Sequence, residues 1–156
     1  MAFDFPDLFE AIRAYAAAHV PGLKQTSYPA PSRIVATPCL IVVSGSDQTA
    51  GWDIAHEGPG EQMLTGQAAI QLLVVRVKDA AKEGTLADRM VFPILDAFSV
   101  DRDGLGVEFP DLDQHIDRCV VTHYTANASM TYGGGEKYVG VEFVLDIKFH
   151  RVWDQE

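Results

Sequence analysis

The fold of this chain is indicated most clearly by the stretch Val139-Gly140-Val141-Glu142-Phe143-Val144-Leu145-Asp146-Ile147-Lys148-Phe149-His150. Apolar and polar residues alternate along it, as in a β-strand with one buried face. The apolar face comprises Val139, Val141, Phe143, Leu145, Ile147 and Phe149. The opposite face, toward solvent or a neighbouring subunit, carries Glu142, Asp146, Lys148 and His150. A second strand over 116–131 and a glycine-rich turn over 132–136 come before it, so we predict a long terminal β-hairpin.

The beginning of the chain has the pattern of an amphipathic helix. Asp4 is a suitable N-cap, and Asp7 lies three residues later in the first turn. The apolar residues at helical spacing are Phe5, Leu8, Phe9, Ile12 and Ala16. Pro21 and Gly22 end this helix, and the proline-rich residues 21–33 predict an extended connection.

A second helix is predicted to begin at Thr85. Thr85 and Asp88 have the spacing of a capping box, with aspartate in place of the usual glutamate. The apolar residues at helical spacing are Leu86, Met90, Val91, Ile94, Leu95 and Phe98. Pro93 lies within the pattern and is expected to kink the helix without ending it.

Two further strands are expected between these helices. Residues 34–43 end in an apolar run, and Pro38 predicts a bulge or pairing on one side only. Residues 67–78 are almost continuously apolar, which is typical of a central strand covered on both faces. Residues 44–66 are rich in glycine and polar residues, and we expect a long loop there. Residues 101–115 are expected to form an acidic loop.

Together these elements predict an α+β fold with a single domain over residues 1–156. Its mostly antiparallel β-sheet would be flanked by two main helices. The length of 156 residues suits one domain, since domains cluster at about 100–150 residues. Hydrophobic residues make up 47% of the chain, which is enough for one core.

The composition also bears on where the protein works. No stretch reaches the roughly 18 consecutive apolar residues of a membrane span, so we expect no membrane contact. The acidic start after Met1 differs from a secretory signal, and we expect assembly in the cytoplasm. Cys39 and Cys119 lie within apolar runs, which favours two buried, free thiols.

The charge of the chain argues against direct binding of nucleic acid. The net charge is −10, with 12 Lys and Arg against 22 Asp and Glu. Binding would require basic side chains that neutralise phosphates. An acidic surface can instead line a channel through which DNA passes without binding, because like charges repel.

Candidate catalytic and metal-binding residues match no recognised motif. Glu142 and Asp146 share a strand face but lie about 13 Å apart, whereas a glycosidase pair requires roughly 5–9.5 Å. The five histidines, which fall on different elements, are His19, His56, His115, His123 and His150. They lack the spacing of a zinc site. We therefore expect a protein that is not an enzyme and needs no cofactor.

A calcium site is the remaining alternative among the metals. Residues 101–113 begin like a calcium loop, but leucine stands at its fifth and twelfth positions, where oxygen ligands belong. An irregular cation site within these residues stays open.

The segment 44–66 carries the main candidate interface. Its only large apolar residues are Trp52, Ile54, Met63 and Leu64. Ordering a backbone costs about 1–2 kcal/mol of conformational free energy per residue. So polar a segment buries too little apolar surface on its own domain to offset this cost. Loops of this length are usually functional, so we expect contact with another subunit to order it, with Trp52 as the anchor.

The order of elements resembles that of the tail terminator (tail completion) proteins of long-tailed bacteriophages. The resemblance is carried by residues 5–16, 37–43, 70–77, 86–98 and 120–149, and so covers almost the whole chain. It implies a mixed sheet flanked by helices and a homo-oligomeric ring of six subunits in the neck of the virion. Such a ring caps the tail tube, contacts the head connector or stopper, and lets DNA pass through without binding it specifically.

Two other classes of function stay open. One is another virion component, such as a head–tail stopper or a tail-tube subunit. A tail-tube subunit would polymerise into open stacks, whereas a terminator would stop at a closed ring. The other is a small-molecule-binding protein or enzyme whose site is built from scattered residues; a pocket with converging polar groups would favour it.

Overall fold

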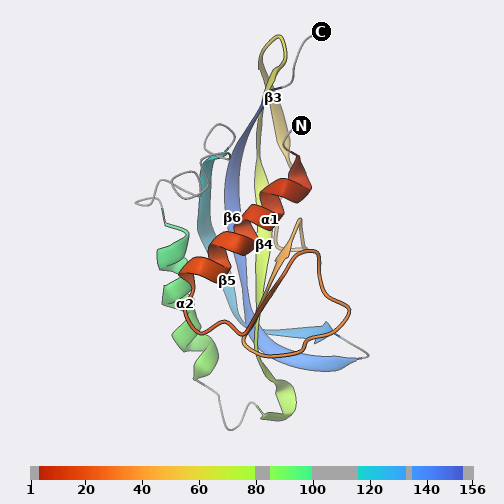
Figure 1. The fold of residues 1–156 in the computed structure, drawn as a ribbon, viewed down its shortest axis with the longest axis vertical. Coiled ribbons are helices and arrows are strands. Elements are labelled where there is room, and N and C mark those ends of the chain that lie inside the picture. Colours follow the sequence, from red (N-terminus) through yellow and green to blue (C-terminus); the bar gives the residue numbers. More distant parts are fainter. Residues whose placement is uncertain (1–3, 80–84, 100–115, 133–134, 153–156) are drawn as a thin grey trace.

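The computed structural model describes residues 4–79, 85–99, 116–132 and 135–152 of the chain. Within them, helices α1 (Phe5–His19) and α2 (Leu86–Ala97) lie on one face of a β-sheet (Figure 1). The strands are β1 (Gln25–Ser27), β2 (Cys39–Val43), β3 (Asp53–Gly58), β4 (Glu61–Arg76), β5 (Ile116–Tyr132) and β6 (Glu136–Val152). A short 3-10 helix, η1 (Val77–Asp79), follows β4. The predicted single-domain α+β fold is confirmed.

The sheet is mixed and mostly antiparallel, as predicted. Its strand order is β1-β2-β4-β6-β5, and β3 pairs with β4 outside this path. Only β1 and β2 run parallel among the pairs of the described strands. The long strand β4 is therefore the centre of the sheet, since β6 covers one of its edges while β3 and β2 share the other.

The two predicted helices are both present. Asp4 and Asp7 form a reciprocal capping box at the start of α1, with N···O distances of 3.0 and 3.3 Å. The capping box predicted at Thr85 is wrong, because the Thr85 side chain makes no capping hydrogen bond. Helix α2 continues through Pro93, as expected. Neither described helix is long and apolar enough to cross a membrane.

The strand predicted at 34–43 is shorter in the structure. Only Cys39–Val43 pairs as β2. The backbone N–H groups of Val35 and Ala36 donate instead to the side-chain oxygen of Gln25, at 2.8 and 3.2 Å. Gln25 itself belongs to β1, which interrupts the connection expected over 21–33.

The main core lies between the helices and the inner face of the sheet. The apolar face predicted for the terminal strand is confirmed: Phe143, Leu145, Ile147 and Phe149 are buried there, and Val139 is half-buried. They meet Ile12 of α1 and Ile94 of α2, among others. The Tyr15 hydroxyl donates to the Ala97 carbonyl at 2.9 Å, which ties the two helices together.

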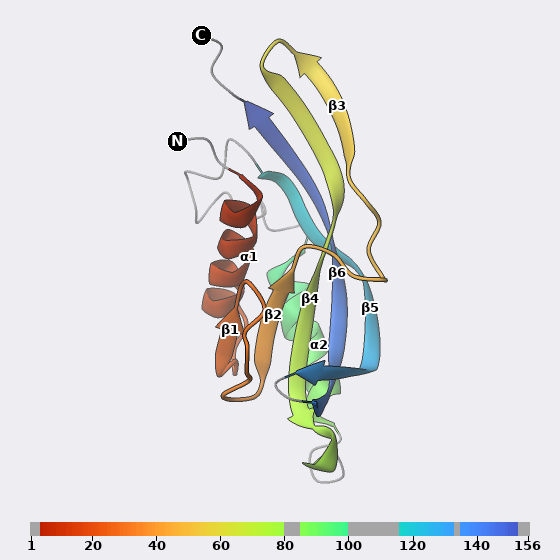
Figure 2. The same ribbon diagram turned by 90° about the vertical axis from the view of Figure 1, so that its right-hand side faces the viewer.

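A second, smaller core covers part of the outer face. Its buried residues are Ile34, Cys39, Ile41, Leu73, Met130 and Tyr138. In both views the turn end of the β5–β6 hairpin swings away from the direction of the other strands (Figures 1 and 2). The register shifts in β4 between Leu73 and Val75 and in β5 between Thr125 and Ala128 accompany this bend.

The loop predicted over 44–66 is wrong for its second half. Residues 53–58 form β3, and β4 begins at Glu61, six residues before the predicted start at 67. Gly60 makes the turn between them with a positive φ of 74°. One edge of the start of β4 pairs with β3 across this local turn, whereas its other edge is completed by the end of β6, about 90 positions away, where Glu61 is paired with Val152.

This extension forms an arm at one end of the molecule. It consists of β3, the first part of β4 and the last part of β6 (Figure 2). All six residues of β3 are exposed.

Candidate functional site

The polar face of the terminal strand lies where it was predicted, on the side of the sheet away from the helices. Glu142 is opposite Gln71 on β4, Asp146 is opposite Gln67, and Lys148 is opposite Thr65. Glu142 and Asp146 are half-buried, whereas Lys148 is exposed. The face thus combines an ordered polar centre with a charged, exposed end.

The two carboxylates have separate partners in their own chain. Ser46 donates its hydroxyl to Glu142. Gln67 donates to the Oδ1 atom of Asp146 at 2.8 Å and accepts from the Ala50 backbone at 2.7 Å. These bonds fasten the first half of the 44–66 segment to its own sheet. The carboxylates therefore act as anchors for this segment and do not form a joint acid–base pair.

A polar pocket of about 360 Å³ lies beside Glu142. Ser46, Gln71, Thr131 and Tyr132 contribute to its lining. The Tyr132 hydroxyl donates to the Gln71 side chain. Burial is the main cause that raises the pKa of Tyr132, with further contributions from the neighbouring Cys39 and Glu142.

Trp52, which we predicted to anchor the segment to another subunit, is half-buried and packs against the core of its own domain. Its ring contacts the Phe5 ring edge-on, with centroids 4.9 Å apart. The ring also covers Gly66, where a Cβ atom would come within 2.3 Å of it. The close approach that glycine allows seats the indole against the sheet, so Trp52 stabilises the fold.

The other apolar residues of this segment divide between core and surface. Leu64 is buried in the main core at 7% exposure, so its assignment to an interface is wrong. Met63 is half-buried. Ile54 remains a candidate, because 57% of it is exposed on β3.

The described part of the chain contains no group of side chains that could bind a metal ion. No cluster of three or more His, Cys, Asp or Glu side chains occurs among those residues. His123 is opposite Val144 and His150 is opposite Met63, on different strand pairs. The candidate cation site over 101–113 and His115 lie outside the described residues.

The two cysteines are free and buried, as predicted. Cys39 belongs to the outer small core and Cys119 to the main core, so the sheet separates them. Burial raises the pKa of Cys39 to about 11 and that of Cys119 to about 12, from an ordinary value of 9.0. Both thiols are therefore protonated and unreactive at neutral pH.

Because both thiols are buried and protonated, we expect a thiol reagent to label the folded protein slowly. At pH 8 the folded protein should react negligibly, and unfolding without reductant should reveal two thiols, counted by mass spectrometry. The same shifts lower stability as the pH rises above about 9, because the unfolded thiols then lose protons that the folded ones keep. Rapid labelling of the folded protein, or no thiols after unfolding, would contradict the assignment.

Sequence reasoning missed one surface feature, a groove at the end of the molecule away from the arm. Residues 33–37, the end of β4 and the start of β6 line it. Val35 lies two residues after Arg33 within the strand expected over 34–43, and no local pattern there indicates a groove.

Comparison with known proteins does not identify a family for this chain. No protein-family model matches the chain, and no curated protein is similar enough to match it.

Proposed function

We propose that this chain is a structural subunit of a long-tailed bacteriophage, in which six copies form a closed ring. The ring caps the tail tube, joins it to the head connector or stopper, and lets DNA pass through. It works in the neck of the virion, and the role requires no catalytic residue and no cofactor.

The observation that carries this proposal is the arm. All six residues of β3 are exposed, and within the described chain β3 pairs only with β4. Its other edge leaves backbone hydrogen-bonding groups without a strand partner, and such an edge commonly pairs with a second polypeptide. An arm of this kind gains little from its own domain and suits contact between subunits.

Two further features support the proposal. Strand β5 lies at the end of the strand order, so the terminal hairpin provides a second long edge for contacts between copies. The net charge of −10 suits a passage that DNA crosses without binding. The resemblance to tail terminators in the order of elements points the same way.

Light scattering and negative-stain images of the purified protein, with and without tail tubes, test this function. We expect closed rings of uniform mass that bind one end of the tube. In the free subunit the amides at the unpaired edge of β3 should exchange quickly with solvent, and assembly should protect them. A strictly monomeric protein that never joins tubes would contradict the proposal.

The same images separate the alternatives. Open stacks formed by the protein alone would identify a tail-tube subunit, and rings that bind the head side only would identify another neck protein. The polar pocket beside Glu142 favours a small-molecule binder. A monomer that is stabilised against heat by a small metabolite would support that reading.

A further inference from the structure

Besides the three-residue β1, two strands of the described sheet have an edge without a strand partner. Within the described residues β3 pairs only with β4, and β5 pairs only with β6. Figure 1 shows the two strands on opposite sides of the β4–β6 pair. One copy of the chain can therefore offer its β5 edge where the next copy offers its β3 edge.

The open part of the β5 edge is its middle. At Val121 the edge is closed, because the Val121 N–H donates to the Phe98 carbonyl at 3.1 Å. The next five residues, 122–126, are all exposed. Beyond them the turn end of the hairpin swings away from the other strands (Figure 2). The open stretch is thus similar in length to the six exposed residues of β3.

Each open edge carries one exposed apolar or aromatic side chain on the face of the sheet that the helices cover. Ile54 of β3 is 57% exposed and is opposite Leu64, which belongs to the main core. Tyr124 of β5 is 43% exposed and is opposite Phe143, which belongs to the same core. Cross-strand partners share a face, so Ile54 and Tyr124 would share one in a sheet that continued from copy to copy.

The strand directions suit such a continuation. Strands β3 and β6 both run antiparallel to β4, and β5 runs antiparallel to β6. Within a subunit β3 and β5 therefore run in opposite directions. Copies that continue the sheet around a ring keep these directions, so the two edges meet as an antiparallel pair, which is the more stable arrangement.

Charge distinguishes β5 from a second β3 as the partner of the β3 edge. β3 carries the carboxylates Asp53 and Glu57, whereas residues 122–126 of β5 carry none and include His123. Pairing β3 with itself would collect four carboxylates, two from each copy, on one short ribbon. Like charges on neighbouring strands repel, so the β3 edge is better matched by β5.

We propose that residues 53–56 of β3 in one copy pair antiparallel with residues 122–125 of β5 in the next copy of this chain. The pairing places Ile54 opposite Tyr124 and extends the apolar row that Tyr124 already forms with Phe143. The two edges are different surfaces, so each copy uses both and the contact repeats until the ring closes. This inference rests on the proposed ring function and identifies the strands that build the ring.

The step between copies agrees with a closed sheet. Within one subunit Ile54 is level with Phe149 of β6, and so with Ile116 of β5. Tyr124 is level with Phe143, six residues before Phe149, so pairing shifts each copy by about 20 Å along the strands. The four strands of one copy span about 19 Å across the sheet. Together these give a strand tilt of about 45°, close to the 35–45° of closed barrels.

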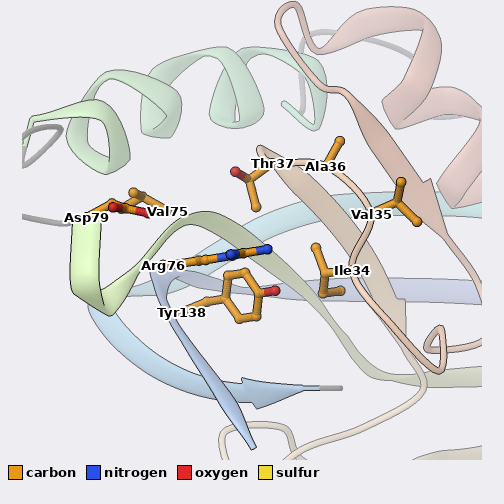
Figure 3. Close-up of a pocket in the computed structure, with 8 residues that line it drawn as sticks. All are labelled: Ile34, Val35, Ala36, Thr37, Val75, Arg76, Asp79 and Tyr138. Carbon is orange, nitrogen blue, oxygen red and sulfur yellow. The ribbon is translucent and has the colours of Figure 1, made fainter. Parts of the chain in front are cut away.

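Aspartate variants of the two edges test this pairing. Ile54→Asp places a charge on the β3 edge, and Tyr124→Asp places one on the β5 edge. The matched control is Val35→Asp, because Val35 is 73% exposed but lies in the groove at the end of the molecule away from the arm (Figure 3). Circular dichroism and thermal melting first establish that all three fold. In light scattering after gel filtration, the edge variants should associate more than about tenfold more weakly than the wild type, and the control should assemble normally.

Single cysteines identify the partner of each edge and do not depend on the aspartate variants folding. Residues directly opposite each other in an antiparallel pair have Cβ atoms about 4.5–5.5 Å apart. A short bifunctional thiol reagent should therefore link an Ile54→Cys copy to a Tyr124→Cys copy. An equimolar mixture should give a covalent dimer on a denaturing gel, and neither variant alone should. The native Cys39 and Cys119 are buried and stay unlinked.

The cross-linking separates failure of the inference from failure of the proposed function. A covalent dimer from Ile54→Cys alone, or from Tyr124→Cys alone, would show that an edge pairs with itself and would overturn the inference. Wild-type rings with no cross-link in the mixture would also overturn it, and the ring function would stand. If rings form only on tail tubes, the mixture is cross-linked there. A wild-type protein that neither forms rings nor joins tubes overturns both.

Discussion

Replacing Phe143 with alanine is expected to lower the free energy of unfolding by about 3–5 kcal/mol. Phe143 has no exposed surface and lies at the middle of β6, paired with Ile70 on one side and Tyr124 on the other. Its ring centroid is 5.9 Å from that of Tyr124. Truncation would remove the burial energy of the ring and leave a cavity that strands fixed on both edges cannot close.

The matched control is Lys148→Ala, which lies on the same strand but on the exposed outer face. It should change stability by less than about 0.5 kcal/mol. Glu142→Ala should cost about 1 kcal/mol because Ser46 loses its acceptor. Urea denaturation of the three variants measures this, and equal effects would show that the register of β6 is wrong.

The second large effect is expected at Gly140, where the hairpin bends. A Cβ atom built there would lie 1.8 Å from the Leu72 carbonyl oxygen and 2.9 Å from the Met130 side chain. The oxygen belongs to the backbone of a central strand and cannot move without breaking the ladder. Gly140→Ala should therefore cost about 3 kcal/mol or more, at the upper end of the range for overpacked sites.

Gly51→Ala provides the control for this substitution. Nothing lies within 4 Å of a Cβ atom added at Gly51, so stability should stay within about 0.5 kcal/mol of the wild type. Thermal melting of the two variants is sufficient for the comparison. A Gly140→Ala protein as stable as the Gly51→Ala protein would contradict the close approach of β6 to β4.

The two sites differ in how far the sequence alone could predict them. The burial of Phe143 was predictable from alternation in the sequence, because a strand with one apolar face must bury that face. The constraint at Gly140 was not, since it depends on a carbonyl oxygen of Leu72, which is far away in the sequence. An isolated glycine in a strand pattern indicates a close approach but does not identify the neighbour.

The candidate interface was only partly predictable for the same reason. Composition selected Ile54, Trp52 and Leu64 alike as apolar residues in a polar segment, and only the structure shows that Ile54 is exposed whereas Leu64 is buried. Gly66 makes room for Trp52 on its own sheet, and pairing with β6 brings Leu64 into the core. The groove around Val35 is assembled from three separate segments and had no local signal.

The sequence was sufficient to predict the elements whose periodicity is local: helix α1 with its Asp4 cap, helix α2, the apolar β4 run and the alternating β6 strand. The arm, the bend and the groove are visible only in the folded chain. The physical reason is that a helix satisfies its backbone groups within a few residues, whereas a strand needs a partner. Residues 61–65 have a local partner in β3, but their second partner is the end of β6, which lies beside them only in the folded chain.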